Sequence, residues 1–171
     1  MALAALKLGR EQIRVAVLSA VVSTLAYLGG SRFTALFHGA SAGVGGLWSM
    51  ISAVVVLQAT RRATLTSAGL RVLGTLIGAA ISWFYLSIFP YSLVGMTICI
   101  GLTVLLGQTT GTPDHARLAA ITVAVIMITS AAHPTLSPAL NAALRLAESC
   151  IGAGITVLAA HLWPEVWRIQ W

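Results

Sequence analysis

Two similar stretches decide the fold. The first reads LRVLGTLIGAAI at residues 70–81, and the second reads LRLAESCIGAGI at residues 144–155. Six of their twelve aligned residues are identical, including the pair Arg71 and Arg145. Shared Leu, Ile, Gly and Ala are common among apolar helices, but an arginine is rare there because its charge is costly to bury in a membrane. The similarity therefore indicates an internal repeat with one arginine in each copy.

The composition predicts a membrane protein. Of the 171 residues, 58% are hydrophobic and only 8% are charged, and the mean hydropathy is +0.93. A soluble domain usually carries about 25% charged residues, so this chain lacks the polar residues that a water-facing surface requires. These values exclude a soluble enzyme, a disordered chain and a sizeable domain outside the membrane. The net charge of +6 does not indicate a nucleic-acid partner, because the basic residues are spread between apolar runs.

Six apolar runs predict six spanning helices. Each is near the length of about 20 residues that a helix needs to cross a bilayer, and the runs are continuous rather than alternating. We therefore predict an all-α integral membrane six-helix bundle, a single domain over residues 1–171, with residues 1–12 as a candidate helix on the membrane surface. The expected spans are residues 13–28, 44–59, 65–89, 91–108, 116–132 and 138–163.

The repeat also predicts how the spans are arranged. The two similar segments lie in the third and sixth spans, so they cross the membrane in opposite directions. A 3+3 inverted repeat of this kind is the architecture of many transporters, which bind substrate near the bilayer midplane between the two repeats. Transport is therefore the leading function class.

The basic residues predict the orientation. With the N-terminus in the cytoplasm, eight of them fall on or near the inner side and only Arg32 falls in an outer loop. This positive-inside asymmetry predicts a multi-pass protein of the cytoplasmic membrane with both termini in the cytoplasm. The eight inner residues are Lys7, Arg10, Arg14, Arg61, Arg62, Arg71, Arg117 and Arg168.

A longer pattern resembles a known family. Trp48 opens the second span, a Val-rich run ends in Gln58, and Arg-Val-Leu-Gly-Thr follows at residues 71–75. Together with Arg145, Gly152 and Trp163-Pro164, this pattern resembles the fusaric-acid-resistance and aromatic-acid-exporter superfamily, of which plant aluminium-activated malate channels are distant relatives. The resemblance covers roughly residues 44–164.

The resemblance implies export of organic anions, often aromatic carboxylates, across the bacterial inner membrane. Larger members of the superfamily add a soluble cytoplasmic domain or a second six-helix half. Because this chain stops seven residues after Pro164, the resemblance implies that a partner supplies the second half, and we expect a homodimer.

The candidate substrate contacts are Arg71 and Arg145, joined on the resemblance by Trp48 and Gln58. Glu148 is the only acid inside a span, so it is the candidate for proton coupling. Two structural alternatives stay open: Arg145 forms an ion pair with Glu148 one turn later, and Arg71 anchors its helix in the lipid headgroups.

We expect no catalytic residue, cofactor or metal site. The four acids and four dispersed histidines form no recognisable catalytic or metal-binding cluster, so an enzyme is not expected. Two alternatives to an exporter remain, namely a passive anion channel of the same fold and a membrane scaffold that transports nothing. A response of anion flux to a collapsed proton gradient would separate the exporter from the channel.

Overall fold

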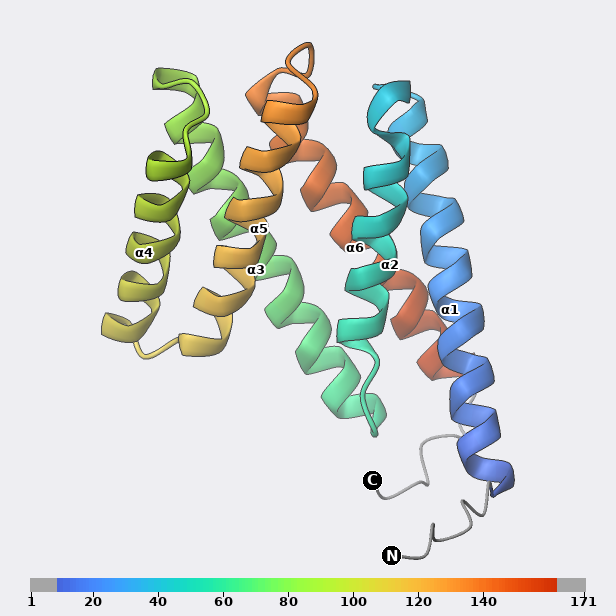
Figure 1. Cartoon of the computed structure of the whole chain (residues 1–171). Helices are drawn as coiled ribbons and strands as arrows, with labels where there is room; N and C mark the ends of the chain where they lie inside the picture. Colours follow the sequence, from blue (N-terminus) through green and yellow to red (C-terminus); the bar gives the residue numbers. More distant parts are fainter. Residues whose placement is uncertain (1–8, 163–171) are drawn as a thin grey trace, which may run out of the picture.

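The computed structural model describes residues 9–162 and contains six α-helices (Figure 1). A single turn of 3-10 helix, η1 (Gly39–Ser41), precedes the second of them. No strand occurs between residues 9 and 162, and the prediction of an all-α six-helix bundle is confirmed. The helices are α1 (Arg10–Ala35), α2 (Ala42–Val56), α3 (Arg61–Ile88), α4 (Leu93–Thr109), α5 (Pro113–Ala132) and α6 (Pro138–Leu162).

Local capping determines where several helices begin. The Thr60 side chain accepts a hydrogen bond from the backbone N–H of Ala63 at the start of α3, and Ser92 does the same for Gly95 at the start of α4. Pro113 occupies the first position of α5, where the backbone N–H that proline lacks would have no partner within the helix. These starts keep the connections before α3, α4 and α5 short.

The first helix differs most from its expected span. The sequence predicted an end at residue 28, whereas α1 continues to Ala35. Gly30 lies inside this helix and packs closely on α2, where a Cβ would lie 2.7 Å from the carbonyl oxygen of Gly45. Of the expected surface helix, residues 1–8 lie outside the described residues, and residues 10–12 belong to α1. Trp163, expected in the sixth span, also lies outside them.

The six helices alternate in direction, so α1 begins and α6 ends at the same end of the bundle (Figure 1). Five helical segments of the described chain are long and apolar enough to cross a membrane, and the second of them, Gly39–Val56, joins η1 to the 15-residue α2. The sixth, α4, is apolar but has 17 residues, which is the lower limit of about 17–25 residues for a span.

The arrangement follows the inverted repeat. The pair α1–α2 lies on one side and the pair α4–α5 on the other, while α3 and α6 run obliquely between them in opposite directions (Figure 1). α2 packs on α6, and α5 packs on α3 in the equivalent place. A half-turn about a line perpendicular to the view in Figure 1 therefore exchanges α1, α2 and α3 with α4, α5 and α6.

Equivalent glycines make equivalent contacts in the two halves. Gly78 of α3 packs directly on the backbone of Ala119 in α5, with Thr122 beside it. Gly152 of α6 packs in the same way on Ser49 and Ser52 of α2. A Cβ at either glycine would overlap a backbone carbonyl oxygen, so close helix approach depends on both.

The contact between Thr75 and Ser149 locates the axis of this symmetry. These two residues occupy the same position in the aligned segments, and their hydroxyl oxygens lie 3.0 Å apart. Two equivalent residues contact each other in this way only next to the symmetry axis. In an inverted repeat that axis lies in the membrane plane, so the Thr75–Ser149 pair marks the middle of the bundle.

The exterior is apolar and the interior is partly polar. Large apolar side chains such as Leu25, Leu73, Leu105 and Leu158 are exposed on the outer faces of their helices, as a lipid-facing surface requires. The interior instead contains small and hydroxyl-bearing side chains, including Thr34, Ser49, Ser52, Thr75, Thr122, Ser149 and Thr156, all fully buried.

Candidate functional site

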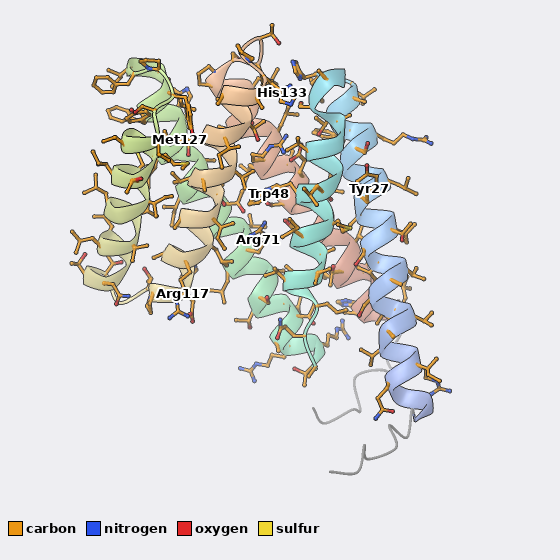
Figure 2. All side chains as sticks on the ribbon, in the orientation of Figure 1. Tyr27, Trp48, Arg71, Arg117, Met127 and His133 are labelled. Atoms are coloured by element: carbon orange, nitrogen blue, oxygen red, sulfur yellow. The ribbon has the colours of Figure 1, made fainter. Side chains whose placement is uncertain are left out.

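Three ionisable side chains are buried at the centre of the bundle. Arg71 of α3 is 1% exposed, and Arg145 and Glu148 of α6 are 0% exposed. Trp48 of α2 lies next to Arg71 near the middle of the bundle (Figure 2). An Arg71 side chain anchored in the lipid headgroups was one of the sequence-based alternatives, and its burial shows that alternative to be wrong.

Arg145 and Glu148 form an ion pair. Nη2 of Arg145 lies 2.9 Å from Oε1 of Glu148, one helical turn later. The same carboxylate oxygen accepts a hydrogen bond from the hydroxyl of Thr34 in α1. Gly45 of α2 makes room for this contact, because a Cβ there would lie 2.6 Å from Oε1 of Glu148 and overlap Thr34. Glu148 therefore connects α1 with α6.

Arg71 has no acidic partner among the described residues, and its contacts are neutral. Its guanidinium carbon lies 4.4 Å from the ring centroid of Trp48, within the range of a cation–π contact. Its Nε donates a hydrogen bond of 3.0 Å to Oγ of Ser52. The Arg71 charge is therefore held by an aromatic ring and a hydroxyl.

Trp48 connects the two arginines. Its ring contacts the Arg71 guanidinium, and its Nε1 donates a hydrogen bond of 3.1 Å to the backbone carbonyl oxygen of Arg145. A row of hydroxyl groups lies beside it: Oγ of Ser52 is 3.3 Å from Oγ of Ser149, which contacts Thr75 in turn. Helices α2, α3 and α6 therefore meet in one polar cluster.

Several polar atoms of this cluster lack an aligned hydrogen-bond partner among the described residues. They include Nη2 of Arg71, Oε2 of Glu148 and all three guanidinium nitrogens of Arg145, whose contact with Glu148 is close but poorly aligned. With two guanidiniums and one carboxylate ionised, the cluster carries a net charge of +1. A buried, positively charged group of unpaired donors is suited to bind an anion.

The cluster is closed in this conformation. Arg71, Arg145 and Glu148 have almost no exposed surface, and none of them lines any of four cavities on the bundle. A ligand therefore reaches the guanidiniums only after the helices around them move.

The family comparison identifies the class of protein. The model of the fusaric acid resistance protein-like family matches residues 33–159, which is most of the chain and includes every residue of the buried cluster. The chain belongs to this family. Neither a curated protein nor a solved structure gave a significant match. The resemblance seen in the sequence is thus confirmed, and membership of the fusaric acid resistance protein-like family together with the apolar helices supports a multi-pass membrane transporter.

Four of the five sequence-predicted site residues of this family member come together. Arg71, Arg145, Trp48 and Glu148 form the cluster, whereas Gln58 lies outside it. Gln58 is exposed in the connection between α2 and α3, and its side-chain amide donates to the carbonyl oxygen of Val55. It borders a cavity of about 500 Å³ whose lining includes Thr60, Arg62, Thr66, Ser67 and Leu70.

Sequence reasoning missed the hydroxyl groups of the site. Thr75 and Ser149 are aligned in the repeat and could have been found as an equivalent polar pair inside apolar helices. Ser52 lies one helical turn after Trp48, so its place beside the ring follows from helix periodicity. Thr34 gave no signal, because its partner Glu148 is 114 residues away in the sequence.

Proposed function

We propose that this chain exports organic carboxylate anions across the bacterial inner membrane, with Arg71 and Arg145 as the carboxylate contacts. The observation that carries this proposal is the buried cluster of two guanidiniums and one carboxylate, in which both guanidiniums have nitrogens without an aligned partner. A carboxylate that leaves water loses its hydration, so fixed positive charge must stabilise it inside the membrane. A guanidinium stays charged when buried and can bind a carboxylate with two parallel hydrogen bonds.

Aromatic carboxylates are the substrate class we propose. The Trp48 ring centroid lies 4.4 Å from the Arg71 guanidinium carbon. When the carboxylate of an aromatic substrate binds Arg71, the substrate's ring would therefore stack on Trp48. We assign Gln58 to the inner mouth of the pathway, where its cavity also contains the cationic Arg62. A positive charge at this mouth would attract anions from the cytoplasm.

Glu148 is the proposed proton-coupling residue. It shares the Arg145 guanidinium with any bound anion, because its carboxylate already lies 2.9 Å from Nη2. Protonation removes the negative charge of Glu148 and so frees Arg145 for the substrate. The charge state of this one side chain would then link anion binding to the proton gradient.

We further propose that the protein works as a homodimer. Closed two-fold pairing is the commonest form of oligomer, and larger relatives are expected to carry a second six-helix half. Mass measurement in mild detergent should find two chains per particle. A monomer at concentrations where transport persists would contradict this part of the proposal.

The test of the proposed function is efflux from proteoliposomes. Vesicles containing the purified protein are loaded with radiolabelled benzoate, and release is compared with protein-free vesicles. We expect protein-dependent release that changes when a protonophore collapses an imposed proton gradient. Release that ignores the gradient would favour a passive channel of the same fold. No release of benzoate or of a panel of other organic carboxylates would favour a scaffold.

A further inference from the structure

We infer that the buried cluster contains two anion sites, and that Glu148 and Thr34 keep the Arg145 guanidinium occupied whereas the Arg71 guanidinium has no competing carboxylate. The inner anion site is the Arg71 guanidinium with Trp48 and Ser52, and the outer anion site is the Arg145 guanidinium with Glu148. The inference rests on the proposed function, which it extends by giving the two arginines separate roles and an order of occupation.

The symmetry axis separates the two sites. Thr75 and Ser149 contact each other at the axis, and each arginine lies four residues before one of them. Because α3 and α6 run in opposite directions, Arg71 lies toward the end of the bundle where α1 begins, and Arg145 lies toward the other end. A helix rises about 1.5 Å per residue, so each guanidinium belongs to a backbone position roughly 6 Å along its helix from the axis.

One difference between the two sites is a residue that breaks the symmetry of the aligned segments. In the aligned segments the residue equivalent to Glu148 is Gly74. A side chain has no room at Gly74, because a Cβ there would lie 2.6 Å from Cβ of Leu118 and 3.2 Å from the carbonyl oxygen of His115. The inner anion site therefore lacks a carboxylate among its described neighbours, whereas the outer anion site contains one.

Thr34 holds that carboxylate in place. Its hydroxyl donates to Oε1 of Glu148, the same oxygen that contacts Arg145. The space beside this contact exists because α2 carries Gly45 there. Thr34 belongs to α1 in the first half of the chain and Glu148 to α6 in the second, so the contact joins the two halves on the Arg145 side of the axis.

The order of occupation follows from these contacts. An incoming anion meets no competing carboxylate at Arg71, so the inner anion site fills first. Arg145 becomes available only after Glu148 leaves it, which requires the Thr34 contact to break. The substrate then passes the Thr75–Ser149 pair and replaces Glu148 on Arg145. With Arg71 on the cytoplasmic side of the axis, this order carries the anion from the cytoplasm outward, as export requires.

Counting bound anions tests the inference. The full chain in lipid nanodiscs is equilibrated with radiolabelled benzoate, and the number bound per chain is measured at saturation. At pH 8, where Glu148 competes for Arg145, we expect one benzoate for the natural chain, none for Arg71→Gln and one for Arg145→Gln. Glu148→Gln should bind two, because the neutral amide no longer competes for Arg145. The double variant Arg71→Gln with Glu148→Gln should bind one.

The outcomes separate the inference from the proposed function. The two-site inference is wrong if Glu148→Gln still binds one benzoate. It is also wrong if Arg145→Gln binds none while Arg71→Gln binds one. In either case the anion-binding proposal stands. If no variant binds benzoate or the other carboxylates of the panel, the proposed function fails as well. Thr34→Val is the second variant should Glu148→Gln not fold: it removes only the hydroxyl that holds Glu148, and it should expose a second, weaker site.

Discussion

The hydroxyl groups of Thr75 and Ser149 lie 3.0 Å apart at equivalent positions of two segments that run in opposite directions. This contact relates the internal repeat of the sequence to a symmetry axis of the structure. It also explains why Arg71 and Arg145 meet at one central cluster, although 73 residues separate them in the chain. The pseudo-symmetry of the two halves therefore brings the two buried arginines together.

The glycine contacts predict a position-specific loss of stability. Gly152→Ala should destabilise the bundle by about 1–3 kcal/mol, because its Cβ would overlap the carbonyl oxygen of Ser49 and force α2 and α6 apart. Gly154→Ala on the same helix is the matched control, since a Cβ there meets open space. Thermal unfolding in detergent measures both variants. Equal melting temperatures for the two would show that the close contact does not matter.

The dual role of Trp48 predicts a graded series. Trp48→Phe keeps an aromatic face for Arg71 but removes the N–H that donates to Arg145, a loss of about 1 kcal/mol. Trp48→Leu removes the cation–π contact too, which is worth about 0.5–2 kcal/mol more. Benzoate efflux should therefore fall in the order natural chain, Phe variant, Leu variant. Identical rates for all three would mean that the ring does not organise the site.

Much of the site could be predicted from sequence because the contacts are local or repeated. Arg145 and Glu148 lie three residues apart on one helix, so their ion pair follows from helix geometry. The equivalence of Arg71 and Arg145 follows from the alignment of two stretches. The sixth helix, α6 (Pro138–Leu162), begins at the predicted residue because a proline marks its start.

The remaining parts depend on packing between distant segments. The sequence does not reveal that Thr34 contacts Glu148, or that Gly30 is compatible with a continuous α1, because both facts depend on how α1 lies against α2 and α6. Gln58 was assigned to the substrate site with Trp48, but α2 ends at Val56 and leaves Gln58 in an exposed connection. Its proposed role is therefore at the mouth of the pathway.

Competition between Glu148 and the anion predicts a pH dependence. In an Arg71→Gln background only the Arg145 site remains, and protonation of Glu148 removes its competing charge. Benzoate binding should then strengthen as pH falls from about 8 to 6, where benzoate itself stays ionised, by at most about tenfold per pH unit. Adding Glu148→Gln should abolish this dependence. A pH dependence that survives the second substitution would exclude Glu148 as its source.

The orientation predicts where the ends of the chain lie. The even number of helices places the start of α1 and the end of α6 on one side, and the positive-inside asymmetry predicts that this side faces the cytoplasm. A reporter that is active only in the cytoplasm, fused after Trp171, should be active. A periplasm-dependent reporter at the same position should be silent. The opposite pair of results would reverse the topology and the direction of loading.

Efflux of radiolabelled benzoate by Arg145 variants tests the central claim most directly. Arg145→Ala should abolish efflux while the protein still inserts and assembles, and Arg145→Lys should keep the charge but lose affinity. Removing one partner of a buried ion pair costs about 3–5 kcal/mol, so the double variant Arg145→Gln with Glu148→Gln serves as a control without an unpaired charge. It should fold normally and still fail to transport. Normal efflux by Arg145→Ala, or by this double variant, would show that the arginine is structural and would contradict the account.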